Sequence, residues 1–108
     1  MKLALLNTSI LTSTGLFSLD DITLTEAREL VQENLNELDS AIGHQSTAEI
    51  MSSLLEVEIP VNRQVFQQQV EQKALVFKLN GRPEEGKVLT VDDIKNIGYK
   101  FQILERLR

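Results

Sequence analysis

The chain contains no cysteine and no tryptophan, and it has one histidine and one tyrosine among its 108 residues. Without cysteine it has neither a disulfide framework nor a thiolate nucleophile, which fits a reducing compartment. A single histidine with no cysteine argues against a zinc site built from the usual ligands. We therefore expect a cytoplasmic protein whose chemistry needs no metal ion and no other cofactor.

Long apolar runs are also missing. No window approaches the roughly 20 apolar residues that span a bilayer. The run that begins at Met1 stops at Asn7-Thr8-Ser9, too short for the apolar region of about 7 or more residues in a secretory signal. An apolar fraction of 42% and a charged fraction of 25% are typical of a soluble globular protein. We expect one domain over residues 1–108 and no membrane partner.

Positive charge is scarce. Sixteen acidic residues against eleven basic ones give a net charge of −5. Affinity for DNA or RNA comes mostly from neutralising phosphates, so this balance argues against a DNA-binding role. A small anion would have to be held by a few local cations and backbone N–H groups, against the overall field.

Hydrophobic periodicity and capping signals predict most of the elements in the first half of the chain. Thr23 and Glu26 form a capping box before an amphipathic helix over 24–36, and Ser46 and Glu49 form a second box. The predicted elements here are a buried strand over 2–6, a polar loop over 7–21 with a turn at 12–15, the helix over 24–36, a short strand at 40–42 and a helix over 47–55.

The second half is less regular. Pro60 interrupts any helix across 57–70, and we expect a strand over 62–70 that turns near 71–73 and pairs with a strand over 74–79. The glutamine-rich stretch 67–72 is also compatible with a helix. Thr90 and Asp93 form a third capping box for a helix over 91–97 that ends at Gly98, and a last strand covers 99–104. The whole pattern predicts an α/β domain with a mixed, mostly parallel sheet of about five strands and about three helices.

The segment Ile42-Gly43-His44-Gln45-Ser46-Thr47-Ala48-Glu49 holds the only histidine. Gly43 has no Cβ, so a ligand can approach the backbone closely. The helix that starts at Ser46 and Thr47 presents free N–H groups that favour an anion. A phosphate bound there would have His44 beside it, and histidine is the side chain best suited to donate a proton near neutral pH.

A second polar cluster follows about forty residues later, Gly81-Arg82-Pro83-Glu84-Glu85-Gly86. Arg82 offers a cation for a phosphate or for its developing charge, and either Glu84 or Glu85 offers a carboxylate to orient His44. Asn7-Thr8-Ser9 follows the first strand, where ligands gather in α/β sheets, and Arg63 supplies another cation.

Each of these motifs also has a purely structural interpretation. A lone histidine before a helix is commonly a solvated or capping residue, and Ser46 and Glu49 as a capping box need no ligand. Arg82 to Gly86 is commonly just a charged turn, Asn7 to Ser9 another turn, and Arg63 a surface charge. Spacing alone therefore supports an α/β domain with an anion site, and no more.

The chain resembles a family of viral, plasmid and bacterial proteins whose best-understood members are anti-CRISPR ring nucleases. The resemblance runs over nearly the whole length and is carried by four short stretches in order: Leu5-Leu6-Asn7-Thr8-Ser9-Ile10, Ile42 to Thr47, Asn62-Arg63 and Arg82 to Thr90. These enzymes destroy cyclic tetra-adenylate, the second messenger of type III CRISPR systems. The resemblance implies a homodimer that binds one cyclic tetranucleotide across its interface, in the cytoplasm of the host cell if the protein is viral.

The resemblance also implies a mechanism. A ribose 2′-hydroxyl attacks the adjacent phosphodiester without a metal ion and leaves a 2′,3′-cyclic phosphate. His44 is then the general acid that protonates the departing 5′-oxygen, Glu85 supports it, and Arg82 holds the scissile phosphate. The residues implied to bind the ring are Asn7, Ser9, Ser46, Thr47 and Arg63. Two departures stand out: Pro83 replaces a larger apolar residue, and Lys78 stands where a glutamine can occur.

Three functions follow as hypotheses. The first is a ring nuclease, which the presence of His44 and Glu85 favours. The second is a module that sequesters a cyclic nucleotide without cutting it. The third is a small domain that binds another protein and no nucleotide, for which the acidic composition is equally suited.

Overall fold

The computed structural model describes residues 1–81 and 90–108. The strands are β1 (Leu3–Leu6), β2 (Phe17–Ile22), β3 (Leu38–Ser40), β4 (Lys73–Leu79) and β5 (Tyr99–Arg106). The helices are α1 (Leu24–Glu33), α2 (Gln45–Leu55) and α3 (Val91–Ile97), with a 3-10 turn at Leu35–Glu37. The predicted fold class, one α/β domain with a five-stranded mixed sheet and three helices, is confirmed.

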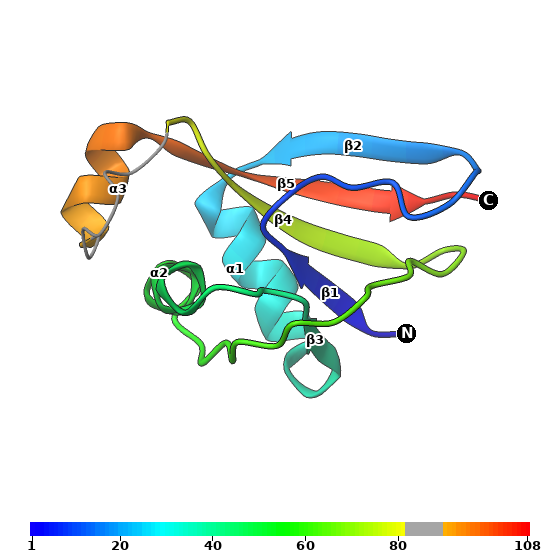
Figure 1. Cartoon of the computed structure of the whole chain (residues 1–108), viewed down its shortest axis with the longest axis horizontal. Helices are drawn as coiled ribbons and strands as arrows, with labels where there is room; N and C mark the ends of the chain where they lie inside the picture. The colour runs from blue at the N-terminus through cyan, green and yellow to red at the C-terminus, as the bar shows by residue number, and fades with distance from the viewer. Residues whose placement is uncertain (82–89) are drawn as a thin grey trace.

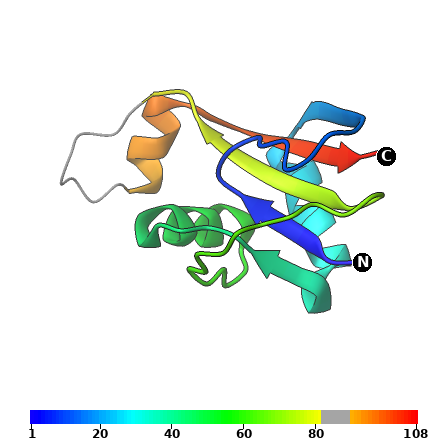
Figure 2. The same ribbon diagram turned by 45° about the vertical axis from the view of Figure 1, so that its right-hand side comes forward.

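The strands form one sheet in the order β2-β5-β4-β1-β3. β1 pairs in parallel with β3 and β4, whereas β5 pairs antiparallel with β4 and β2. Two of the four strand pairings are therefore parallel, whereas the sequence predicted a mostly parallel sheet. Because β1, β3 and β4 run in the same direction, their carboxyl ends share one edge, at the end of the molecule where α2 and α3 lie (Figures 1 and 2).

The helices pack on one face of this sheet, which alternation along the strands makes apolar. On β4, Leu75 and Phe77 join the core that contains the helices, while Ala74 and Val76 face the other way. Those two join a second, smaller core with no residue from a helix, formed with Ala4, Leu6 and Leu104. Phe17, Ala41 and Phe66 cover it in part. We call this side of the sheet the helix-free face.

Two of the three predicted capping boxes are confirmed. At α1, the Glu26 amide donates to Thr23 Oγ1 and the Thr23 amide donates to Glu26 Oε1, both at 3.1 Å. Thr90 and Asp93 make the same exchange at α3, which ends at Gly98 with φ of 90°. Local sequence determined these helix boundaries, because both partners of each bond lie within three residues.

The remaining predicted box, at Ser46 and Glu49, is wrong. α2 begins at Gln45, so its N-cap is His44, which has the extended backbone that an N-cap requires (φ −126°, ψ 131°). Ser46 already lies inside the helix, and Glu49 accepts a hydrogen bond from the Gln45 side chain at 2.9 Å. The predicted start at residue 47 was therefore two residues late.

The predicted strand over 62–70 is also wrong, because 61–69 contains neither strand nor helix and β4 pairs with β1 and β5 instead. The segment is held by side chains. Gln68 is fully buried, and its Nε2 donates to the carbonyls of Gln72 at 2.8 Å and Leu104 at 3.0 Å. These amide bonds replace the ladder bonds that a strand would make, and the helical alternative for 67–72 is excluded as well.

Two strands differ from prediction at the edges of the sheet. The polar loop expected over 7–21 contains β2, an edge strand that pairs only with β5 and whose exposed residues include Asp20 and Asp21. The strand expected at 40–42 is observed two residues earlier, as β3. The Ala41 amide, just beyond its end, still donates a hydrogen bond to the Leu5 carbonyl at 3.0 Å.

Candidate functional site

The predicted site residues follow the strands whose carboxyl ends share one edge. Asn7 comes directly after β1, and His44 comes four residues after β3. The carboxyl end of β4 leads along the chain to Arg82. Ligands gather at such an edge in α/β sheets, because loops from different strands meet there. The topology thus supports a shared location for the segments that hold Asn7 and His44.

His44 contributes its backbone to the helix and leaves its side chain free. Its carbonyl accepts the first hydrogen bond of α2, from the Ala48 amide at 3.1 Å. The imidazole makes no capping bond, and the residue is exposed. An exposed imidazole at the start of a helix can reach a bound anion without breaking any contact of the fold.

Arg63, which the resemblance implied as a ring-binding residue, lies against the His44 segment. Its Nε donates to the Gly43 carbonyl at 3.1 Å. A Cβ placed on Gly43 would lie 3.0 Å from Arg63 Cγ and 3.3 Å from Nε, so the contact depends on the missing side chain. The guanidinium is exposed beyond this bond, which leaves its other N–H groups available for an anion.

Backbone and side-chain bonds hold the two segments together. The Asn62 amide donates to the Ile42 carbonyl at 2.8 Å, and Asn62 Nδ2 donates to the Ser40 carbonyl at 2.9 Å. Ser40 Oγ in turn donates to the Pro60 carbonyl at 2.7 Å. These bonds explain why an irregular segment carries a cation to a fixed place beside His44. No periodic signal could have predicted them, since each joins residues about twenty positions apart.

Ser46 and Thr47 occupy the first turn of α2, where N–H groups have no intrahelical acceptor. Because no side chain caps this terminus, those groups remain available to an anion. Ser46 is exposed and Thr47 half-buried. The missing capping box therefore favours the predicted ring-binding role of this turn more than the expected box would have done.

Asn7 and Ser9 lie in the bend that follows β1, with Asn7 exposed and Ser9 half-buried. Neither side chain makes a hydrogen bond to a residue in the part of the chain that the structure describes. Arg82, Glu84, Glu85 and Pro83 lie outside the described residues. The predicted meeting of His44 with Arg82 and Glu85 therefore stays a prediction.

The structure brings together a cluster of charged residues from which the sequence had singled out only Lys78. Lys78 and Lys100 face each other across β4 and β5, and Asp21 lies beside them on β2. Lys100 Nζ is 3.6 Å from Asp21 Oδ1, and Gln102 Nε2 donates to the same oxygen at 2.8 Å. The hydrogen bond from Gln102, aided by the charges of Lys100 and Lys78, holds the pKa of Asp21 below its ordinary value of 3.8.

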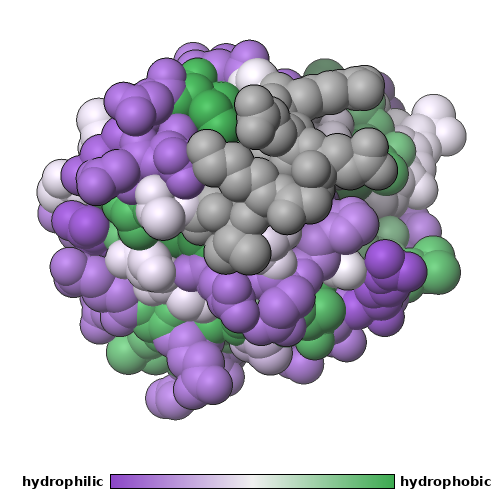
Figure 3. Space-filling model, turned by 60° about the vertical axis from the view of Figure 1, so that its left-hand side comes forward, coloured by the Kyte–Doolittle hydropathy of each residue, from purple (hydrophilic) through white to green (hydrophobic). Residues whose placement is uncertain are grey.

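Figure 3 views the end of the molecule that carries α2 and α3. Hydrophilic surface predominates there, and apolar side chains are scattered among it. Within residues 1–81 and 90–108, no group of three or more His, Asp or Glu side chains is placed to hold a metal ion. Over the same residues no helix has the length and apolar character needed to cross a bilayer.

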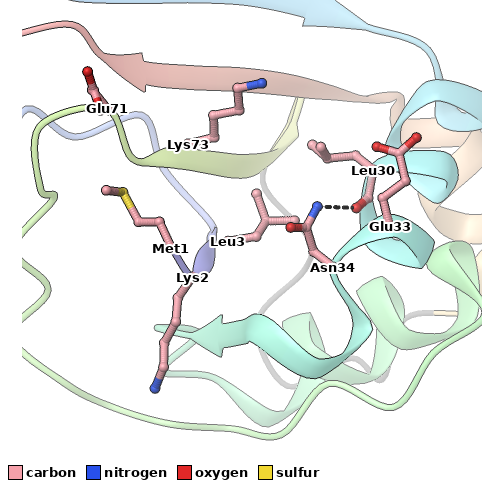
Figure 4. Close-up of a pocket in the computed structure, with 8 residues that line it drawn as sticks. All are labelled: Met1, Lys2, Leu3, Leu30, Glu33, Asn34, Glu71 and Lys73. Carbon is pink, nitrogen blue, oxygen red and sulfur yellow. Dashed lines mark hydrogen bonds between the residues drawn. The ribbon is translucent and has the colours of Figure 1, made fainter.

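A separate hollow of about 350 Å³ lies near the opposite edge, at the amino ends of β1 and β4 (Figure 4). Leu3 and Leu30 contribute apolar surface, and the charged residues that line it are Lys2, Glu33, Glu71 and Lys73. Acidic and basic groups balance here, and the Lys2 and Lys73 ammonium groups point in different directions. This hollow therefore lacks the positive character that a polyanionic ligand requires.

Comparisons with known proteins agree over nearly the whole chain. A sequence model of a family described as STIV B116-like matches residues 3–101. The uncharacterized protein YddF of Bacillus subtilis strain 168 is 36% identical over 107 residues, covering 99% of both chains. The uncharacterized protein 26 of Sulfolobus islandicus filamentous virus is 39% identical over 87 residues, covering 79% of this chain and 71% of its own.

A third relative and a solved structure extend the same group. The uncharacterized protein ORF117 of Acidianus two-tailed virus is 33% identical over 93 residues, 85% of this chain and 80% of its own. The structure of B116 of Sulfolobus turreted icosahedral virus superposes with a TM-score of 0.81 at 25% identity, over 98% of this chain and 100% of that one.

Proposed function

This chain belongs to the STIV B116-like family, and from that premise we propose that it is a metal-independent ring nuclease that cleaves cyclic tetra-adenylate. Destroying this messenger would shut down type III CRISPR signalling. The proposal is supported most by one arrangement: an exposed imidazole at the uncapped start of α2, with the Arg63 guanidinium bonded to the neighbouring Gly43 carbonyl.

In the proposed reaction the substrate supplies its own nucleophile. The ribose 2′-oxygen bonds to phosphorus and releases its proton to solvent, while the bond from phosphorus to the 5′-oxygen breaks. His44 donates a proton to that departing oxygen, and the product ends in a 2′,3′-cyclic phosphate. Such chemistry needs positioning, which is worth about 7–11 kcal/mol in favourable cases, and a general acid, which adds about 10²–10⁴-fold.

The remaining proposed roles concern binding. Arg63, Asn7, Ser9 and the first turn of α2 at Ser46 and Thr47 hold the ring. Arg82 and Glu85 would complete the site by holding the scissile phosphate and supporting His44. We further propose that the protein acts as a homodimer with the ring across its interface. The described surface offers apolar residues for such an interface, since Leu11 is 63% exposed and Val65 is 99% exposed.

The test is incubation of purified protein with cyclic tetra-adenylate in EDTA, with products identified by mass. We expect linear products that end in a 2′,3′-cyclic phosphate. The variant His44→Ala should bind the ring within about threefold of wild type and lose at least about 10²-fold in cleavage rate, the lower range for a general acid. Gln45→Ala, which alters the next exposed residue, is the matched control and should cleave normally.

Full turnover by His44→Ala would remove histidine from the mechanism, and a strict metal requirement would defeat the whole scheme. Tight binding with the ring recovered intact would favour sequestration instead. No binding to cyclic oligoadenylates of any size would favour a protein-interaction domain.

A further inference from the structure

A pair of like charges stands directly opposite on neighbouring strands. Lys78 of β4 and Lys100 of β5 are register partners in the antiparallel ladder, so both side chains leave the sheet on the same face. Alternation places this pair on the helix-free face, in line with Val76 and Leu104 of the second core. Like charges directly opposite destabilise a strand pair, so the arrangement calls for a counter-charge.

Asp21 supplies only part of that counter-charge. It is 3.6 Å from Lys100, whereas Lys78 makes no ion pair with any residue that the structure describes. The other charged side chain that β2, β4 and β5 place on this face is Arg106, and its Nη1 donates to the Gln68 carbonyl at 2.7 Å. The helix-free face of these strands therefore carries three cations and one acid, opposite in sign to the net charge of −5.

A buried acceptor beside the lysines also lacks a partner. Gln102 is 5% exposed, and its Nε2 must point at Asp21 because a carboxylate can only accept. This orientation leaves Gln102 Oε1 buried with no hydrogen bond in the described structure. A buried acceptor without a partner is destabilising, so the described chain leaves this part of the helix-free face incompletely satisfied.

The lysine pair lies toward the same edge of the sheet as His44. Leu6 pairs with Val76, so Lys78 lies two residues beyond the last paired position of β1, toward the carboxyl edge. β3 leads to His44. In the sheet, β4 lies two strand spacings from β3, about 10 Å, and β5 lies three spacings from it, about 14 Å. α2, whose N-cap is His44, packs on the other face of the sheet, so the lysine pair and His44 do not converge on one phosphate.

We propose that Lys78 and Lys100 together bind one phosphate group of an anionic nucleotide on the helix-free face. Asp21 holds Lys100 in place. The ligand's identity as cyclic tetra-adenylate rests on the proposed function, but the phosphate subsite does not. The pair binds a phosphate other than the one that reacts at His44, so it contributes to affinity and leaves the chemical step unchanged.

The experiment compares two double variants with the same change in net charge. Lys78→Gln/Lys100→Gln removes the pair, and Lys2→Gln/Lys73→Gln removes two exposed lysines at the opposite edge. Lys73 is the best control residue, since it lies on β4 itself but about 16 Å away and on the other face. Calorimetry measures dissociation constants for cyclic tetra-adenylate, adenosine diphosphate and inorganic pyrophosphate, and kinetics separate KM from kcat.

We expect the Lys78/Lys100 double variant to bind cyclic tetra-adenylate at least about tenfold more weakly, with a raised KM and an unchanged kcat. The control should stay within about twofold of wild type. The double variant should stay folded, because it relieves a like-charge contact and keeps the hydrogen bond from Gln102 to Asp21. Lys78→Arg/Lys100→Arg should restore binding, since it restores the charge.

The outcomes separate this inference from the proposed function. Equal binding of the ring by wild type and the Lys78/Lys100 variant would overturn the subsite and leave the nuclease proposal standing. Lysine-dependent binding of pyrophosphate or adenosine diphosphate without any binding of the ring would keep the subsite and refute the nuclease. A wild-type protein that binds none of the three anions would overturn both.

Discussion

Gly43 is the residue on which the neighbourhood of His44 depends most directly. A Cβ added to Gly43 would lie only 3.0 Å from Arg63 Cγ. That distance is too short for an undisturbed contact, yet the atoms that must move belong to a flexible side chain. A larger residue at 43 would therefore displace the guanidinium without breaking the fold.

We predict that Gly43→Ala weakens binding of cyclic tetra-adenylate by about three- to tenfold while changing stability by less than about 1 kcal/mol, as expected of a substitution away from the core. The reason is that Arg63 loses its bond to the Gly43 carbonyl and its defined position. Calorimetry and denaturant unfolding measure the two quantities. Gly81→Ala, where the added Cβ would meet only the Ile97 side chain at 3.3 Å, is the comparison for a small steric change elsewhere. Unchanged affinity in Gly43→Ala would remove Arg63 from the ring-binding set.

Asp21 makes stability depend on pH in a predictable direction. Its folded pKa is held below 3.8, first by the hydrogen bond from Gln102 and then by Lys100 and Lys78. A lowered folded pKa means that ionised Asp21 stabilises the fold above the unfolded pKa. This contribution is lost as pH falls through the folded pKa.

We therefore expect wild type to melt above Asp21→Asn at pH 6, and the difference in Tm to shrink as pH falls from 3.8 through the lowered folded pKa, until the carboxyl group is protonated in both states. Thermal unfolding followed by circular dichroism across pH 2–7 checks this. Asp20→Asn, whose side chain lies on the other face of β2, is the matched control and should show a smaller change. A difference that stays constant down to pH 2 would contradict the assignment.

At the scale of elements, the chain divides into helices that local signals predict and segments that distant contacts determine. The boxes at Thr23 and Thr90 could be found in the sequence because each partner is three residues away. The path of 61–69 could not, since Gln68 bonds Leu104, thirty-six positions later. β2 escaped prediction for a related reason: its partner β5 lies eighty residues on, and edge strands tolerate polar residues such as Asp20.

The α1 capping box yields a test at this scale. Thr23→Ala removes the Oγ1 acceptor of the Glu26 amide, and we expect a loss of about 1 kcal/mol in the free energy of unfolding. Urea unfolding measures this. Thr25→Ala makes the same substitution inside the helix, where alanine is the better helix former, so it should be neutral or slightly stabilising. Equal effects of both substitutions would mean that the cap does not stabilise α1.

At the scale of the whole molecule, part of the surface is more apolar than an isolated domain requires. Thr12 bonds Gln67 and Gln68, which places the loop containing Ile10 and Leu11 next to the segment containing Val65. Phe66, in the second of these segments, packs on the second core, and both segments expose apolar side chains to solvent. Exposed apolar groups gathered in this way are typical of an interface.

We predict that the protein is a dimer in solution and that Leu11→Ser/Val65→Ser raises its dimer dissociation constant at least about tenfold, because apolar burial is lost from both copies of a two-fold interface. Sedimentation equilibrium measures the constant. Leu35→Ser, at a 47% exposed leucine in the 3-10 turn, controls for lost surface hydrophobicity. A monomeric wild type would refute the dimer, and an unchanged constant would move the interface elsewhere.

How much of the candidate site was predictable follows from the same division. Local motifs and the family resemblance sufficed to nominate Asn7, His44 and Arg63, and the structure adds that Arg63 contacts the His44 segment. Lys100 and Asp21 could not be predicted from the sequence, because only the register between β2, β4 and β5 reveals that they share a face. Lys78 and Lys100 are twenty-two residues apart in the sequence, so no local sequence pattern reveals that they pair across two strands.

The strand order also governs how the chain can fold as it leaves the ribosome. β5 lies between β2 and β4 in the sheet, yet it is synthesised after every other strand. Until its residues emerge, β2 has no partner and one edge of β4 stays open. Pairings between strands this remote in sequence delay folding, because the entropy of closing the long loop is lost before the paired strands contribute any stability. Nascent chains that stall before residue 99 should therefore be substrates for chaperones, with unpaired strand edges exposed.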